Sequence, residues 1–499
     1  MTQMAQHFDV LIIGAGISGI GSAVHLKLKA PQKKFAILER RESIGGTWDL
    51  FRYPGIRSDS DMSTFGFEFK PWTQSKVLAD GTSIRNYVNE TAKEYNIFEH
   101  IHFQRQVKTA NWSSARKMWE LEVLNVANNT TEQWTADFLL GCTGYYNYDQ
   151  GFKPAYPDED KFKGTVIQPQ HWPENLDYSG KKVVIIGSGA TAITLVPSMA
   201  DKAAHVTMLQ RSPTYIATVP AIDALYDKMK KFMPEKVAYQ LTRSRNIGVQ
   251  RLVFKLSQEK PELVKKFLLK AVKLQVGKHV DMKHFTPNYN PWDQRLCVVP
   301  DGDLFKTIKR GKASVETDQI ERFTENGILL KSGKQLDADI IVSATGLNIQ
   351  ILGGLQATID GQPVNTSNHM LYKGVLLSNI PNAAIIIGYT NASWTLKVDV
   401  AADYLARLFN YMDKKHYKVV LAKADASELT DDTVMGSLAS GYIKRAEHVM
   451  PRQGKSEPWR VSMNYLKDKA ELRSSSFEDD ILTFDGGKAN NKKRFKLFG

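Results

Sequence analysis

The strongest constraint on this chain of 499 residues is a glycine-rich fingerprint that occurs twice. The two copies read Gly14-Ala15-Gly16-Ile17-Ser18-Gly19 and Gly187-Ser188-Gly189-Ala190-Thr191-Ala192. Each copy follows an apolar, β-branched run and precedes a helix-like stretch, which is the context of a dinucleotide-binding turn. The first glycine permits the tight bend, the second lets the backbone approach a pyrophosphate, and the third position lets helix and strand pack closely. We therefore predict that these two loops bind two dinucleotides.

The residues that follow each fingerprint distinguish the two predicted ligands. Glu39 ends the strand-like run after the first copy, where an acidic side chain accepts hydrogen bonds from a ribose. Because an acid repels a 2′-phosphate, this site suits FAD or NAD. The corresponding position after the second copy has no acid, and Arg211 and Ser212 follow that strand instead. A guanidinium pairs well with a phosphate, so the second site suits NADPH.

Alternating strand-like and helix-like patterns at the start of the chain indicate a parallel sheet with crossover helices. Two similar segments, residues 137–145 and 339–347, each read as an acid, a buried strand and a Thr-Gly turn. We predict an α/β fold with two Rossmann-like domains, in which the NADP domain is inserted into the FAD domain. The expected boundaries are 1–148 and 341–485 for the FAD domain, 149–221 and 286–340 for the NADP domain, 222–285 for a helical insert and 486–499 for a flexible basic tail.

The expected insert carries apolar residues at helical spacing. They form the groups Leu225, Met229 and Phe232, then Leu252 and Leu256, then Leu263, Phe267 and Leu274. Basic residues cluster over the same region. A basic amphipathic helix can lie on a membrane, but packing over a substrate cleft is the favoured interpretation. Loose, peripheral association with a membrane stays open as an alternative.

Composition narrows the class of protein. A hydrophobic content of 42% and an aromatic content of 10% indicate a globular chain of two or three domains. The net charge of +13 suits phosphate-rich cofactors, and since no nucleic-acid-binding motif accompanies it, no nucleic-acid partner is expected. Cys142 and Cys297 lack CxxC spacing, which argues against a disulfide framework, a metal site and a dithiol redox centre. We expect a cytoplasmic protein, since the apolar N-terminal run reads as a strand rather than a signal peptide.

Four segments carry a resemblance to a known family. Residues 46–59 match the pattern GxWxxxxYPGxxxD, and residues 162–173 nearly match FxGxxxHxxxWP. Both patterns are typical of Baeyer–Villiger flavin monooxygenases, which the chain resembles over nearly its whole length. Residues 290–297 and 389–397 resemble the ethionamide-activating subgroup specifically. The resemblance is far more specific than the glycine loops alone.

The resemblance implies FAD and NADPH as cofactors, and insertion of one oxygen atom from O2 into ketones to give esters. Sulfides and thioamides are implied as further substrates. By position, Arg295 matches the catalytic arginine, which would stabilise developing negative charge. Asp59 matches the acid that positions this arginine beside the flavin. Further cofactor contacts carried over by position are Thr47, Trp48, Asp49, Leu50, Arg57, Ser58, Asp59 and Val107.

One position departs from the family signature, because Gln168 stands where the family has histidine. An amide cannot protonate near neutral pH, so this change puts the coupling of NADPH oxidation to oxygen insertion in question. A flavin monooxygenase limited to S- or N-oxidation is therefore the main alternative. A second alternative is a flavoprotein that has only a redox-sensing or membrane-binding role. The sequence leaves substrate identity and oligomeric state open.

Overall fold

The computed structural model describes residues 6–436 and 440–486. Nearly all of the expected basic tail, residues 487–499, lies outside this range. The helices are α1 (Ile17–Lys29), α2 (Thr47–Leu50), α3 (Met62–Phe65), α4 (Gly81–Glu94), α5 (Ala190–Met199), α6 (Ala224–Lys230), α7 (Glu235–Glu259), α8 (Pro261–Val276), α9 (Asp303–Lys309), α10 (Trp394–Lys415), α11 (Gly441–Arg445) and α12 (Tyr465–Ser474).

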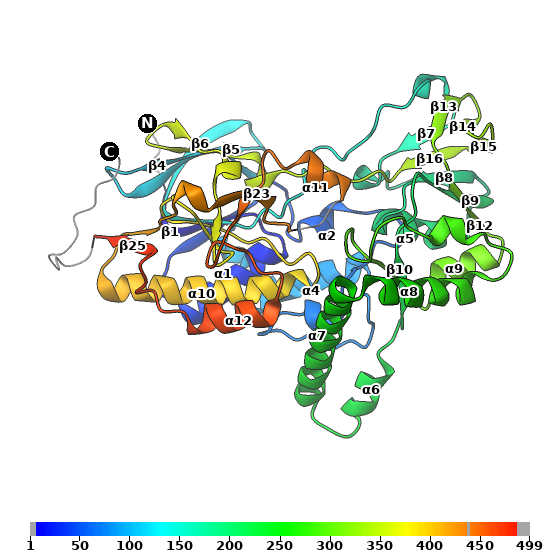
Figure 1. The fold of residues 1–499 in the computed structure, drawn as a ribbon. Coiled ribbons are helices and arrows are strands. Elements are labelled where there is room, and N and C mark those ends of the chain that lie inside the picture. The colour runs from blue at the N-terminus through cyan, green and yellow to red at the C-terminus, as the bar shows by residue number, and fades with distance from the viewer. Residues whose placement is uncertain (1–5, 437–439, 487–499) are drawn as a thin grey trace.

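The first large sheet is built around β1, which contains the chain's N-terminal apolar run. Its main path has the strand order β18-β17-β4-β5-β6-β1-β2-β3, and β21 pairs with β6 beside it. These strands are β1 (Gln6–Ile13), β2 (Phe35–Leu38), β3 (Ile101–His102), β4 (Arg105–Ser113), β5 (Met118–Asn125), β6 (Thr130–Gly141), β17 (Gln356–Ile359), β18 (Gln362–Pro363) and β21 (Ala383–Ile385). Helices α1 and α10 pack together against this sheet and bury its apolar face (Figure 1).

The second large sheet is all parallel and has the strand order β12-β9-β8-β16-β7. These strands are β7 (Thr165–Ile167), β8 (Lys182–Ile186), β9 (His205–Gln210), β12 (Ala313–Thr317) and β16 (Ile340–Ser343). Every residue of β8 except the first is buried, as a central parallel strand requires. The predicted α/β class with two Rossmann-like sheets is confirmed. Because β16 belongs to this sheet, the sheet extends past the expected boundary at residue 340.

The two similar segments noted in the sequence occupy equivalent places in the two sheets. The strand β6 of the first segment runs parallel to β1, and β16 of the second runs parallel to β8. Each of these strands therefore lies directly beside the strand that leads into a glycine fingerprint. The repeated pattern marks the same structural position in each domain.

Smaller strand pairs and triplets complete the structure. They are β10 (Ile216–Val219) with β11 (Cys297–Pro300), β13 (Ile320–Thr324) with β14 (Gly327–Leu330) and β15 (Gln335–Asp337), β22 (Val419–Ala422) with β25 (Leu482–Asp485), and β23 (Leu429–Thr433) with β24 (Arg452–Gly454). The strands β19 (Leu371–Tyr372) and β20 (Leu376–Leu377) belong to the first large sheet, because β20 pairs with β21. The strand β11 follows Arg295 directly, so this short parallel pair fixes the backbone next to that residue.

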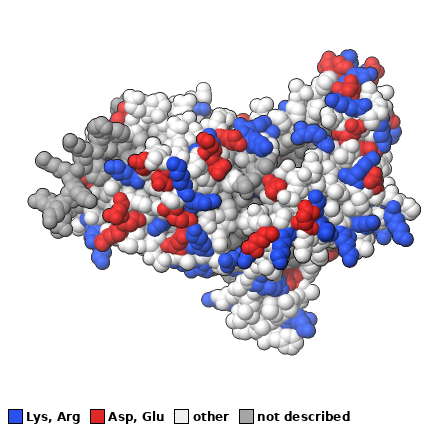
Figure 2. Space-filling view, in the orientation of Figure 1, with Lys and Arg blue, Asp and Glu red and all other residues white. Residues whose placement is uncertain are grey.

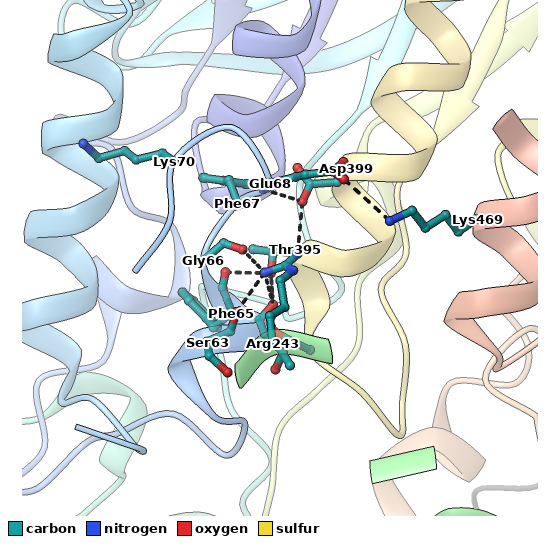
Figure 3. A network of polar contacts seen from close by, with 12 residues as sticks. Ser63, Phe65, Gly66, Phe67, Glu68, Lys70, Arg243, Thr395, Asp399 and Lys469 are labelled. Carbon is teal, nitrogen blue, oxygen red and sulfur yellow. Dashed lines mark hydrogen bonds and ion pairs between the residues drawn. The ribbon is translucent and has the colours of Figure 1, made fainter. Parts of the chain in front are cut away.

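Helices α6, α7 and α8 occupy the region expected to hold a helical insert. In Figure 1, α6 and the far end of α7 project away from the two sheets, and Figure 2 shows the same projection in outline. The N-terminal half of α7 is fixed by Arg243, whose guanidinium is buried against α3 and the glycine that follows it (Figure 3). Its Nη1 donates to the carbonyl oxygens of Ser63 at 2.9 Å and Gly66 at 2.6 Å, and Nη2 lies 3.6 Å from Asp399 Oδ2.

We expect Arg243→Met to loosen the attachment of α7. The substitution leaves several buried carbonyl groups without a donor and Asp399 without its guanidinium, a loss worth about 3 kcal/mol. Thermal unfolding should therefore show a lower Tm. The matched control is Arg251→Met, which removes an exposed arginine from the same helix and should change stability by less than about 0.5 kcal/mol. Equal Tm values for the two variants would contradict the anchoring role.

Candidate functional site

Both glycine fingerprints line a single cavity of about 1260 Å3. This cavity is also lined by the carboxyl ends of β1 and β2 from the first sheet and of β8 and β9 from the second. Ligands in open α/β sheets bind outside the carboxyl ends of the strands, so both sheets present their expected binding edge to the same space. The volume exceeds that of a typical single-ligand pocket, which agrees with two dinucleotides bound side by side.

The first fingerprint fits a dinucleotide by its backbone shape. Gly14 has a φ of +100°, and a Cβ there would lie 2.8 Å from the carbonyl oxygen of Cys142. A side chain is therefore excluded where the turn passes the end of β6. A Cβ on Gly16 would lie 3.6 Å from the Cα of Gly46, so the backbone packs closely here, and Gly16 itself lines the cavity. Helix α1 begins at the next residue, and its unpaired N–H groups suit a pyrophosphate.

Glu39 is buried at the end of β2 and is held by backbone donors. The N–H of Ala15 donates to Oε2 at 2.7 Å, and the N–H of Arg41 donates to Oε1 at 2.9 Å. Burial raises the pKa of Glu39, while these N–H groups and the nearby arginines lower it in part. Each carboxylate oxygen keeps a further lone pair for a ribose hydroxyl. The arrangement suits the ribose-binding role predicted for this residue.

The second fingerprint repeats the same design. Gly187 has a φ of +140°, and a Cβ there would overlap the carbonyl oxygen of Ala344 after β16. A Cβ on Gly189 would meet nothing within 4 Å, and α5 begins at the following residue. Arg211 follows β9, and its exposed side chain lines the cavity. The loop therefore fits a nicotinamide dinucleotide with a phosphate near Arg211.

Arg295 lies in the same cavity and is held by a tyrosine. Its Nη2 donates to Tyr145 Oη at 3.0 Å, and its Nε has no partner among the described residues. Interaction with the neighbouring phenol groups, Tyr145 first, and with Asp59 raises the pKa of Arg295, so it stays a cation. Its remaining donor capacity is available for an anionic group in the cavity.

Asp59 lines the same cavity as Arg295. Within the described residues no ion pair of 4.0 Å or less joins Asp59 and Arg295, and the positioning role expected for Asp59 stays a prediction. Burial raises the pKa of Asp59, while the positive charges of Arg295 and Arg57 lower it. Asp59 therefore acts on Arg295 through the field across the cavity, and Tyr145 makes the contact.

Three tyrosines around Arg295 were missed by the sequence reasoning. Tyr145 and Tyr146 follow β6, with their hydroxyl oxygens 3.1 Å apart, and Tyr442 comes from α11. Burial raises the pKa of Tyr146 to about 12, and it also raises the pKa values of Tyr145 and Tyr442. All three stay neutral at physiological pH. A polar aromatic pair at the carboxyl end of a central strand was a usable signal for the first two, but nothing in the sequence linked Tyr442 to them.

Most of the predicted site residues line the cavity. They are Gly14, Gly16, Ser18, Glu39, Thr47, Trp48, Arg57, Ser58, Asp59, Val107, Gly187, Ser188, Gly189, Ala190, Thr191, Arg211, Ser212 and Arg295. Gly19, Asp49, Leu50 and Ala192 are absent from its wall. Arg57 lines the cavity while its Nη1 donates to Asp303 Oδ2 at 2.6 Å.

The side chain of Asp49 is committed to other protein groups. Arg41 and Arg52 each donate to a carboxylate oxygen of Asp49 at 2.7 Å, and Ser43 Oγ donates at 2.6 Å. Asp49 is also buried. Asp49 therefore ties the segment before α2 to the residues around it, and its cofactor contact stays a prediction.

Gln168, the departure from the family signature, also lies away from the cavity wall. It follows β7, and its buried Nε2 has no hydrogen-bond partner in the part of the chain that the structure describes. A Cβ added to Gly151 would lie 2.7 Å from this nitrogen, so Gln168 packs tightly on the segment that links the two sheets. Its position is that of a linker residue and not of a cofactor ligand.

Comparison with known proteins shows the family of this chain. The model of the flavin-binding monooxygenase-like family matches residues 8–428, and the chain belongs to that family. Its relatives include the "Probable FAD-binding monooxygenase AlmA" of Acinetobacter baylyi, which is 65% identical over 97% of each chain. The FAD-containing monooxygenase EthA of Mycobacterium tuberculosis is 50% identical over 96% of this chain and 98% of its own. The predicted family resemblance is confirmed.

Solved structures show the same fold. An oxidised steroid monooxygenase bound to NADP superposes with a TM-score of 0.77 at 20% sequence identity, over 97% of this chain and 100% of the other. The arrangement of the two sheets and the inserted helices is thus an established one. Its family and its fold therefore identify the chain as a flavin-binding monooxygenase.

Proposed function

We propose that this chain uses FAD and NADPH to insert one oxygen atom from O2 into ketones, giving esters, and that it also oxidises sulfides and thioamides. The observation that carries the proposal is that both glycine fingerprints and Arg295 line a single cavity. Within this reaction, NADPH supplies a hydride and FAD supplies the means to activate O2. The protein binds and orients these groups and manages the charge that develops.

Arg295 is the proposed catalytic residue. A ketone's carbonyl oxygen becomes negatively charged when the carbonyl carbon is attacked, and a fixed guanidinium stabilises that charge. Tyr145 Oη accepts a hydrogen bond from Arg295 Nη2 and so fixes its orientation. Because Tyr145 stays neutral, it holds the cation without cancelling its charge. Asp59 compensates the cation from across the cavity.

The inserted helices are proposed to complete the substrate end of the cavity. Val249 and Val253 of α7 line it, together with Trp292, whose ring packs edge-on against Phe254. A substrate bound against these apolar side chains would displace water from the reacting groups, which would strengthen the effect of Arg295. Their character favours an apolar substrate with one ketone or sulfur centre.

The proposed reaction is tested by product analysis under 18O2. Purified protein with bound FAD is given NADPH together with a simple ketone or a thioether, and products are identified by mass. We expect an ester carrying one 18O atom and a sulfoxide carrying one. Sulfoxide without ester would favour a monooxygenase limited to heteroatoms. Peroxide formation without either product would contradict oxygen insertion altogether.

The phosphate preference of the second site is proposed to depend on Arg211. We expect Arg211→Gln to lower kcat/KM for NADPH by about 10- to 100-fold, because a charged hydrogen bond to the 2′-phosphate is lost. Activity with NADH, which lacks this phosphate, should stay nearly the same. The matched control is Lys202→Gln, which removes an exposed cation outside the cavity. An equal loss with both coenzymes would contradict the assignment.

A further inference from the structure

The exposed apolar side chains of this protein are concentrated on the inserted helices. Among the described residues, 15 large hydrophobic side chains are exposed, and 11 of them lie between residues 222 and 274. Single exposed apolar residues are ordinary on a protein surface, whereas a concentration of them marks a surface with a partner. The insert therefore carries a contact surface beyond its role at the cavity.

Helix α8 is apolar on two faces. Val264, Leu268, Val272 and Val276 recur every four residues and are buried against the body of the protein. A second stripe consists of Leu263, Phe267 and Leu274, with exposed fractions of 59%, 70% and 74%. Only the first stripe is needed to pack the helix in the fold. Nothing in the described chain covers the second stripe.

The second stripe of α8 is bordered by positive charge. Lys266, Lys270 and Lys273 are exposed and lie on the same side of the helix by their spacing. Residues 222–285 as a whole contain 15 Lys and Arg against six Asp and Glu. This segment therefore carries most of the protein's net charge of +13. In Figure 2, Lys and Arg side chains lie over the region of α8 and at the projection formed by α6 and α7.

We propose that the exposed surface of α8, defined by Leu263, Phe267, Leu274, Lys266, Lys270 and Lys273, docks on an anionic phospholipid bilayer. Apolar side chains would enter the headgroup boundary while the lysines pair with lipid phosphates, as in helices that lie in the membrane interface. No described helix is long and apolar enough to cross a membrane, so contact along the surface is the mode that α8 can offer.

Charge favours a lipid surface over a second copy of this chain. Two copies joined through α8 would bring equally basic segments together, and like charges repel. An anionic bilayer supplies both the apolar layer and the opposite charge. The helix α7, which contacts α8, places the exposed Val249 and Val253 in the cavity wall. Docking would thus bring the substrate end of the cavity close to the bilayer.

The test is cosedimentation of the flavin-loaded full chain with vesicles of phosphatidylglycerol and phosphatidylcholine, compared with phosphatidylcholine alone. We expect binding to the anionic vesicles that weakens as salt is raised. Replacing Lys266, Lys270 and Lys273 together with Gln should weaken binding about 100-fold, since each basic residue contributes comparably. The double variant Phe267→Ser and Leu274→Ser should weaken it by roughly 10-fold or more.

Two matched controls separate docking from general effects. Replacing the exposed Lys181, Lys202 and Lys312 with Gln removes the same charge from the NADP domain and should leave binding nearly unchanged. Leu28→Ser removes an exposed leucine from α1 and should also leave binding to the vesicles nearly unchanged. Flavin content and oxidation of a water-soluble substrate should be unaltered in every variant. The proposal would be overturned if the triple variant on α8 and the triple variant in the NADP domain lost vesicle binding equally. It would also be overturned if the unaltered protein did not bind anionic vesicles at low salt.

Sedimentation without vesicles tests the other occupant of this surface. We expect Phe267→Ser with Leu274→Ser to leave the mass of the protein in solution unchanged. If the substitutions instead dissociate an oligomer, the stripe on α8 is an interface between copies and the lipid proposal is overturned.

Discussion

Replacing Arg295 with alanine is expected to abolish ester formation while NADPH still reduces the bound flavin. The reason is that Arg295 supplies the cation that stabilises negative charge on the substrate, whereas hydride transfer needs only the two cofactors in place. Removing one such donor typically lowers kcat by about 100- to 1000-fold. Rapid mixing with NADPH in the absence of oxygen measures the rate at which the flavin is reduced. Product analysis with a ketone in the presence of oxygen measures ester formation.

The control for this loss is Arg310→Ala, which removes an exposed arginine at the end of α9. This variant should leave both flavin reduction and ester formation unchanged. Tyr145→Phe should give an intermediate loss of ester, since the guanidinium remains but its hydrogen bond at 3.0 Å is gone. If Arg295→Ala makes esters at the normal rate, the proposed catalytic role is wrong.

Replacing Gly189 with valine is expected to have a similarly large effect, on the binding of NADPH. A Cβ at this position meets nothing within 4 Å, so the chain itself can accept the larger residue. The valine methyl groups then occupy space that the pyrophosphate of NADPH needs beside the start of α5. We predict a folded, yellow protein with FAD bound, and a KM for NADPH raised by about 100-fold or more, equivalent to about 2.7 kcal/mol.

Two further variants give this prediction its contrast. Gly16→Val should have the reciprocal effect, because it fills the corresponding place in the first fingerprint and should prevent FAD from binding. Gly248→Val, where a Cβ also meets open space, lies outside both fingerprints and should leave the KM unchanged. A normal KM for NADPH in Gly189→Val would show that the second fingerprint does not bind this cofactor.

Local sequence patterns predicted the parts of the site that are formed by local backbone. The turns at Gly14 and Gly187 depend on a strand, a glycine and a helix in immediate succession, so spacing alone placed them. Arg295 and Asp59 were located only through the family resemblance, since neither has a local signature. The structure adds that Arg295 donates a hydrogen bond to Tyr145, a relation between residues far apart in the chain.

Periodicity predicted helices correctly but could not say which face is buried. Leu263, Phe267 and Leu274 have the helical spacing expected of a core stripe, yet they form the exposed side of α8. The buried side is Val264, Leu268, Val272 and Val276, which has the same spacing. Likewise, the sequence around Asp49 gave no sign that Arg41 and Arg52 donate to its carboxylate in the structure.

The central claim is that one cavity brings the nicotinamide and the flavin together so that a hydride passes between them. Anaerobic mixing of the purified, flavin-loaded protein with NADPH, followed by the visible absorption of oxidised FAD, tests this most directly. We predict rapid loss of the yellow absorption, with NADH much less effective than NADPH. A protein that takes up no flavin, or whose flavin keeps its colour in excess NADPH, would contradict the claim.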